Sequence, residues 1–319
     1  AAAAAAAITT SRINSRDSIL ASPDIVGNVL EFVGNDQYLF FAPVSGAWRD
    51  AWFDEQRHQS QNQQRRRPTT TRPVTVDTTV RQLQHSIKWG GLRRDDKEIA
   101  DAAARAGNLE ILQYIWARAL DNGGPAPWDE RTCAWAARRG HCKVLLWARA
   151  NGCPWSTSTC QGAALSGRLD ILIWALLQGC EWDGDTCAAA AGAGRGDILK
   201  WAIDHGCYCD TDTCAAAARW GKLRVLKWAR RRNCPWNADT CSMAARGGHL
   251  EVLRWARENG CDWNSYTCYC AARWGHLEVL QWSRTNGCSW NRLACLEAAL
   301  IAGHKHVTGW MMTSNGWMG

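Results

Sequence analysis

A five-residue phrase with a central cysteine recurs along the chain at a spacing of 27 residues. It reads NGCPW at residues 151–155 and returns as QGCEW, HGCYC, RNCPW, NGCDW and, at residues 286–290, NGCSW. A fixed period of this size is typical of repeat arrays, in which each unit is too small to bury its own apolar face and must stack on its neighbours. The aromatic bias agrees, because 21 Trp against 4 Phe and 5 Tyr is what copying one phrase produces.

The columns of the repeat predict two helices in each unit. In the unit that starts at Cys234 (position 0), Thr240 stands at position 6, alanines at positions 10 and 11, and Gly248 at position 14. Spacings of three and four place such residues on one helical face. We expect the threonine to cap the first helix, the alanines to lie between neighbouring units, and the glycine to end the helix.

A second helix follows in each unit, with Val or Ile at position 18, Leu at 19 and Trp at 21. We expect the tryptophans of positions 2 and 21 to be buried in the core, since each ring can bury about 150–250 Å². The sequence therefore predicts an all-α solenoid of about eight helix pairs over residues 76–319.

The cysteines of positions 0 and 7 have three interpretations: zinc ligands, disulfides or buried structural thiols. Zinc ligands come in pairs about two to four residues apart, whereas the gaps here alternate between 7 and 20 residues. The opening run of seven alanines has neither a basic flank nor the apolar core of a signal peptide, which favours a reducing, cytoplasmic or nuclear compartment. We therefore interpret the cysteines as packing residues and expect no metal and no cofactor.

No motif indicates catalysis. The glycine-rich GAGRG at residues 192–196 lacks the spacing of a phosphate-binding loop and coincides with the turn of the repeat. Histidine recurs beside the turn glycine, at His141, His249, His276 and His304, and a recurring residue of this kind is more often structural than catalytic. We expect a protein that is not an enzyme.

Residues 97–316 resemble the ankyrin repeat, most clearly in GHLEVLRWARENG at residues 248–260. The chain departs from that family where Thr-Cys-Ala-Ala replaces Thr-Pro-Leu-His, and where a period of 27 residues replaces about 33. The missing residues fall where ankyrin repeats carry a β-hairpin. The resemblance implies an ankyrin-like solenoid whose hairpins are reduced to short Cys-x-Trp loops, and a scaffold that binds a partner protein.

Three further segments precede the repeats. Residues 1–21 are an Ala-rich lead, and residues 55–75, which contain the triplet RRR, are a polar and basic linker that serves either as a tether or as a nuclear-import address. Residues 22–54 resemble an F-box, the helical motif that docks onto the adaptor of a cullin–RING ubiquitin ligase. Val33, Val44 and Trp48 match its spacing, whereas Ser22 replaces its leucine. The resemblance implies adaptor contacts at Pro23, Ile25, Val29, Leu30, Val44 and Trp48.

That N-terminal unit has a second interpretation, a helical cap that shields the apolar edge of the first repeat. With an adaptor contact, the chain would be the substrate-recruiting subunit of a ligase. With a cap alone, it would be a bare binding scaffold.

Recognition is expected at positions 12 and 13, which vary between units and which the ankyrin resemblance places on the concave groove. Tryptophan and arginine are enriched in protein interfaces, and they also stack on nucleic-acid bases. The net charge of +7 and the seven basic residues between 219 and 232 allow an anionic ligand. We expect a monomer that binds a protein partner, with nucleic acid as the alternative and no membrane contact. The candidate groove residues are Arg138, Arg139, Arg219, Trp220, Arg246, Arg273 and Trp274.

Overall fold

The computed structural model describes residue 74, residues 78–88 and residues 96–313. These ranges contain 17 helices, labelled α4 to α20, and no strand. None of the described helices combines the length and apolar character needed to cross a membrane. The lead (1–21), the F-box-like segment (22–54) and the linker (55–75) lie outside the described residues, apart from Val74.

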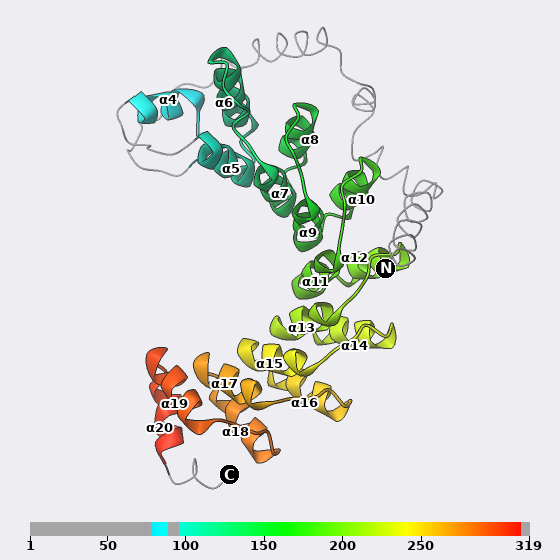
Figure 1. Cartoon of the computed structure of the whole chain (residues 1–319), viewed down its shortest axis with the longest axis vertical. Helices are drawn as coiled ribbons and strands as arrows, with labels where there is room; N and C mark the ends of the chain where they lie inside the picture. Colours follow the sequence, from blue (N-terminus) through cyan, green and yellow to red (C-terminus); the bar gives the residue numbers. More distant parts are fainter. Residues whose placement is uncertain (1–73, 75–77, 89–95, 314–319) are drawn as a thin grey trace, which may run out of the picture. The chain divides into compact units, whose positions relative to one another are not determined.

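The described residues up to Glu181 form one compact unit, unit 1, and those from Trp182 form another, unit 2. Unit 1 contains a single helix, α4, followed by three helix pairs (Figure 1). Its helices are α4 (Val80–Lys88), α5 (Asp96–Ala106), α6 (Leu109–Asp121), α7 (Glu130–Arg139), α8 (Cys142–Ala150), α9 (Thr157–Ser166) and α10 (Leu169–Leu177).

Unit 2 contains five helix pairs of the same kind (Figure 1). The first helices of its pairs are α11 (Gly184–Ala193), α13 (Thr211–Arg219), α15 (Ala238–Gly247), α17 (Ser265–Arg273) and α19 (Arg292–Ile301). The second helices are α12 (Gly196–Asp204), α14 (Leu223–Arg231), α16 (Leu250–Glu258), α18 (Leu277–Thr285) and α20 (Lys305–Met312). The expectation of an all-α solenoid of about eight helix pairs is confirmed, and the loops between units are short.

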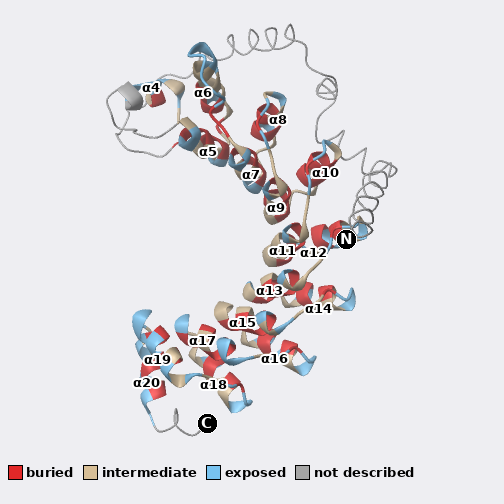
Figure 2. Ribbon diagram, in the orientation of Figure 1, coloured by how far each residue is buried: buried red, intermediate tan, exposed pale blue. Residues whose placement is uncertain are grey.

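The first helices pack against one another in series, α5 to α7 to α9 in unit 1 and α11 through α19 in unit 2. The alanine pair explains this packing: Ala244 and Ala245 of α15, like their equivalents in the other units, have no or almost no exposed surface. A side chain this small lets two helix backbones approach closely. The second helices of unit 2 contact their own first helices more than one another, and Figure 2 shows α14, α16 and α18 exposed at their outer ends.

The threonine of position 6 does not cap the first helix, contrary to the expectation. In α15 the N-cap is Asn237, three residues earlier, and its side chain accepts a hydrogen bond from the amide of Asp239. Thr240 is the third residue of the helix and is fully buried. A short Asp, Asn or Ser at position 3 occupies the cap in the other units as well, because an N-cap must precede the first helical turn.

The expectation that the tryptophan columns are buried holds only in part. In unit 1, Trp128, Trp147 and Trp174 are at most 6% exposed, whereas Trp155 of unit 1 and the tryptophans of positions 2 and 21 in unit 2 are half-buried. The core side of each second helix consists of positions 18, 19 and 22. Position 21 lies on its flank, where apolar neighbours cover the ring in unit 1. Lysine, arginine or glutamine stands at the neighbouring position 20 throughout the second helices α12 to α18 of unit 2.

The glycine at the end of the first helix behaves as expected. Gly248 caps α15 in the left-handed conformation with φ of 75°. A Cβ there would also lie 2.5 Å from Nδ1 of His276 in the following unit. The GAGRG segment is likewise a repeat turn, with Gly194 at φ of 76° between α11 and α12.

Candidate partner-binding groove

The turn histidines fix the ends of consecutive first helices. The Nε2–H of His276 donates to the carbonyl oxygen of Arg246 at 3.1 Å, and that of His304 donates to the carbonyl oxygen of Arg273 at 3.1 Å. His276 stands at position 15 of its unit and His304 at position 16 of the next, and each bond reaches position 12 of the preceding unit. These histidines therefore have a structural role, as the sequence indicated, and they hold the backbone of the candidate groove residues in register.

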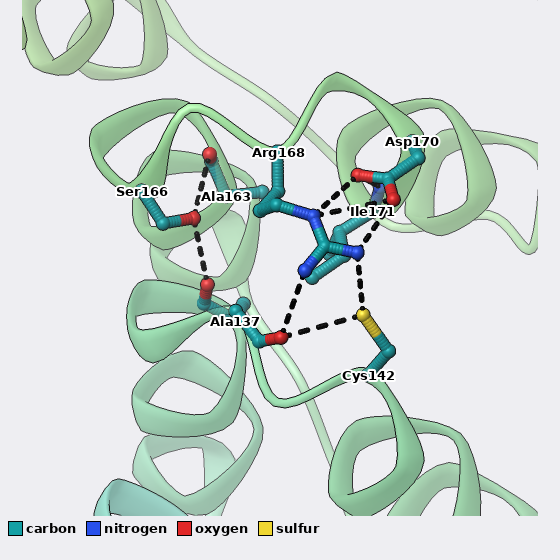
Figure 3. Close-up of polar contacts among 8 residues, drawn as sticks. Ala137, Cys142, Ala163, Ser166, Arg168, Asp170 and Ile171 are labelled. Atoms are coloured by element: carbon teal, nitrogen blue, oxygen red, sulfur yellow. Dashed lines mark hydrogen bonds and ion pairs between the residues drawn. The ribbon is translucent and has the colours of Figure 1, made fainter. Parts of the chain in front are cut away.

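Arg168 takes the place of this histidine in one turn of unit 1 (Figure 3). Its guanidinium donates to the carbonyl oxygen of Gly140 at 3.0 Å and to Sγ of Cys142 at 2.8 Å, and it forms an ion pair with Asp170 at 2.6 Å. The bond to Gly140 crosses between units as the histidine bonds do. The chain can therefore replace the histidine without losing the connection between repeats.

Two tryptophans of position 13 are the most exposed indoles among the described residues: Trp220 is 58% and Trp274 is 46% exposed. The sequence reasoning placed both outside the packing columns. Trp274 lies under the guanidinium of Arg246, whose central carbon is 4.8 Å from the ring centroid. Trp220 lies over the preceding first helix, since a Cβ at Gly192 would be 3.1 Å from its Cδ1.

Each of these tryptophans therefore reaches back across the last turn of the preceding first helix. Arg219 also stacks over Trp220, at 5.4 Å, and Arg273 is exposed beside Trp274. The structure brings Arg246 and Trp274 into one stacked pair from neighbouring repeats. A row of tryptophan and arginine on adjacent helix ends has the composition of an interface anchor.

Arg138 and Arg139 end α7 in unit 1, and both are exposed. Arg138 lies over the ring of Trp135 at 5.4 Å, and Arg105 of the preceding repeat lies over the same ring at 3.9 Å. Unit 1 thus repeats the combination of an indole with an arginine from the preceding repeat, built there around position 9. The candidate F-box contacts Pro23, Ile25, Val29, Leu30, Val44 and Trp48 lie outside the described residues.

Sequence reasoning missed a second arginine column, at position 23 near the end of the second helix. The guanidinium of Arg257 lies 4.4 Å from the ring of Trp263 and donates to the carbonyl oxygen of Cys261. The same stack and bond occur in three other repeats, at Arg149, Arg230 and Arg284. The recurrence of arginine every 27 residues was the available signal.

The stacked tryptophan of position 2 also meets the tryptophan of position 21 in its own repeat. The centroids of Trp263 and Trp282 are 5.8 Å apart with the rings inclined by 62°, and equivalent pairs recur in most repeats. An arginine, a tryptophan and a second tryptophan therefore alternate along the loop edge of the second helices. Edge-to-face rings and a stacked guanidinium stabilise such a row although the rings are only half-buried.

The cysteines pack as small apolar side chains that also donate weak hydrogen bonds. The thiol of Cys261 donates to the carbonyl oxygen of Asn237, the N-cap of the preceding repeat, at 3.2 Å, and Cys288 does the same to Asn264 at 3.3 Å. Burial raises the pKa of the thiols of Cys214 and Cys295 to about 12. These thiols stay protonated at neutral pH, as packing residues do.

The comparisons with known proteins agree with this architecture. The family model described as ankyrin repeats (many copies) matches residues 241–282, from α15 into α18. No curated protein matches the chain at a significant level. The matched segment contains Arg246, Arg273 and Trp274, so part of the candidate groove lies in ankyrin-like sequence.

Proposed function

We propose that the chain is a non-catalytic scaffold that binds a partner protein along the ends of its first helices. The match to ankyrin repeats supports this proposal, since repeats of that class present extended concave surfaces to their partners. The exposure of Trp220 and Trp274, each placed across a neighbouring repeat, is the observation that carries it. A large indole left this exposed and flanked by arginine is typical of an interface hot spot.

The test is capture of a partner by the full chain and by Trp220→Ala and Trp274→Ala variants. Truncation of an interface anchor costs about 2 kcal/mol or more, close to thirtyfold in affinity. The variants should stay folded, because Trp220 and Trp274 each leave about half of their surface exposed to solvent. Arg224→Gln on the second helix α14 is the control. If the tryptophan variants capture the same partner undiminished, the groove is not the binding site.

Salt distinguishes the protein partner from the nucleic-acid alternative. A nucleic-acid ligand that touches several of the seven basic residues between 219 and 232 should lose affinity steeply between 50 and 200 mM salt. A protein partner anchored by tryptophan should lose little. A steep salt dependence shared by many unrelated oligonucleotides would favour the alternative function.

We further propose that residues 22–54 dock onto the adaptor of a cullin–RING ligase, which would make the scaffold its substrate-recruiting subunit. This proposal rests on the spacing of Val33, Val44 and Trp48 in the sequence. The full chain should co-purify with the adaptor, and the double change Pro23→Ala and Val29→Ala should abolish that. A helical cap would instead give no adaptor in either case, and the double change would lower the melting temperature.

A further inference from the structure

A cleft of about 410 Å³ opens between the second helices α14 and α16 of unit 2. It lies on the second helices, whereas the candidate groove lies at the ends of the first helices. Its lining residues are Lys227, Arg230, Arg231, Trp236, Trp255 and Asn259.

The packing of the array explains why there is space at this point. Alanine draws the first helices together, whereas the second helices α14 and α16 approach each other less closely than α13 and α15 do. Half-buried indoles form the walls between them: the centroids of Trp236 and Trp255 are 5.8 Å apart with an interplanar angle of 59°. The cleft therefore follows from the wider spacing of the second helices, and indoles form part of its walls.

Three cations and no carboxylate line this cleft. Positions 20, 23 and 24 of α14 are all basic, whereas the next second helix has Arg254, Arg257 and Glu258 at these positions. In the preceding second helix position 24 is Asp204, which forms an ion pair with Arg232 at 3.2 Å. Lys227 and Arg231 form no ion pair with any residue in 78–88 or 96–313. Within the described part of the chain, Lys227 and Arg231 therefore have no direct carboxylate partner.

The contacts already made by the two indole rings indicate which class of ligand the cleft can bind. Arg230 lies 4.2 Å from the ring centroid of Trp236, and Lys227 lies 5.7 Å from that of Trp255. A cation thus lies over one face of each ring. The two rings are themselves neighbours, and the plane of Trp255 is inclined to that of Trp236 by 59°. Single-stranded nucleic acid needs free aromatic faces on which bases stack. The stacked cations still offer N–H donors, which suit carboxylate oxygens.

We propose that the cleft of Lys227, Arg230 and Arg231 binds an acidic peptide segment through its side-chain carboxylates. Clusters of arginine and lysine recognise acidic motifs in this way, with the charges steering the segment and the donors fixing it. The proposal goes beyond the scaffold function because it assigns a second surface with a different chemistry. The first-helix groove uses exposed indole, whereas this cleft uses charge.

The probe is a fluorescein-labelled hexaglutamate peptide, titrated with the full chain at low salt and followed by fluorescence anisotropy. A hexaglutamine peptide and a twelve-residue oligo-dT are titrated in parallel. The test variant is Lys227→Gln with Arg231→Gln. The control is Arg224→Gln with Arg254→Gln, which removes the same amount of charge. Arg254 is the equivalent of Lys227 in the next repeat: it lies 5.7 Å from the ring centroid of Trp282, as Lys227 lies 5.7 Å from that of Trp255. Circular dichroism checks that both variants are folded.

We expect hexaglutamate to bind the wild-type chain and hexaglutamine not to bind. The test variant should weaken hexaglutamate binding about tenfold, the size expected when two charge contacts to one ligand are lost, and the control should change it less than twofold. Equal losses in the two variants would show a general field effect and overturn the site, as would no binding to the wild type.

Two further outcomes would overturn the cleft proposal without contradicting the proposed scaffold function. Tighter binding of oligo-dT, lost through the same two substitutions, would assign the cleft to nucleic acid. Loss of hexaglutamate binding in Trp220→Ala with Trp274→Ala, but not in the cleft variant, would place the peptide in the first-helix groove. The cleft proposal expects that pair of tryptophan changes to leave hexaglutamate binding unchanged.

Discussion

The last turn of α15 packs tightly against α13 at Gly247. A Cβ added there would lie 2.1 Å from the carbonyl oxygen of Arg219 in α13 and 2.6 Å from Cδ2 of His249. Contacts below 3.0 Å are essentially never seen for a real Cβ. Because the nearest atom belongs to the backbone, Gly247→Ala must push two helix ends apart by close to an ångström. The packing of α15 against α13 beside the candidate groove residue Arg219 therefore depends on this glycine.

The expected size follows from two opposing effects. Overpacking of this kind costs about 1–3 kcal/mol, and the higher helix propensity of alanine returns about 1 kcal/mol. A clash with backbone belongs at the upper end of the first range, so we expect Gly247→Ala to lose about 1–2 kcal/mol of unfolding free energy. Gly309→Ala is the matched control, since it lies inside α20 and an added Cβ meets nothing within 4 Å. It should gain about 0.5–1 kcal/mol.

Urea denaturation of the full chain, followed by circular dichroism and by tryptophan fluorescence, measures both changes. Coincidence of the two probes tests whether the array unfolds as one cooperative unit. The Gly247→Ala midpoint should fall below that of the wild type while the Gly309→Ala midpoint rises. A Gly247→Ala chain as stable as the wild type would refute the close approach of α13 and α15.

Three shorter predictions concern single residues. Asn233 has φ of 60° where the other Cys-x-Trp loops of unit 2 have glycine, so Asn233→Gly should raise the unfolding free energy by about 0.5 kcal/mol in urea denaturation. Burial lowers the pKa of His276, so the folded state resists protonation of this ring. The stability of the chain should therefore fall as the pH drops below about 6.5. Thermal melts at pH 7.5 and 5.5 should show a smaller fall in His276→Gln. Among the thiols, the half-buried Cys142 and Cys209 should react with Ellman's reagent in the native chain, Cys142 slowly because burial raises its pKa, and the fourteen buried ones only after denaturation.

The repeat period and its small-residue columns were enough to predict the fold. Alanine at positions 10 and 11 and glycine at position 14 have one geometric use each, and the structure confirms both. The threonine assignment was wrong because a capping side chain can stand at any of several positions near a helix start. Only the backbone shows that Asn237 precedes the helix and that Thr240 lies inside its first turn.

The candidate groove was predictable as a set of positions but not as a set of contacts. The variability of positions 12 and 13 marks residues outside the core, and the exposure of Trp220 agrees with that. That Arg246 stacks on Trp274 depends on the distance between two repeats, which no single-repeat pattern contains.

The sequence by itself determined that this chain is an array of short helix pairs, because a 27-residue period with alanine, cysteine and glycine columns repeats the same local folding rules in every unit. Tertiary structure alone decided which tryptophans are core and where the charges gather. Whether Trp228 is covered depends on the side chains that the neighbouring helices bring to its flank. The cleft of Lys227, Arg230 and Arg231 likewise exists because first helices approach closely while second helices do not. Spacing between stacked units is a property of the packed array, and a linear pattern of residues does not contain it.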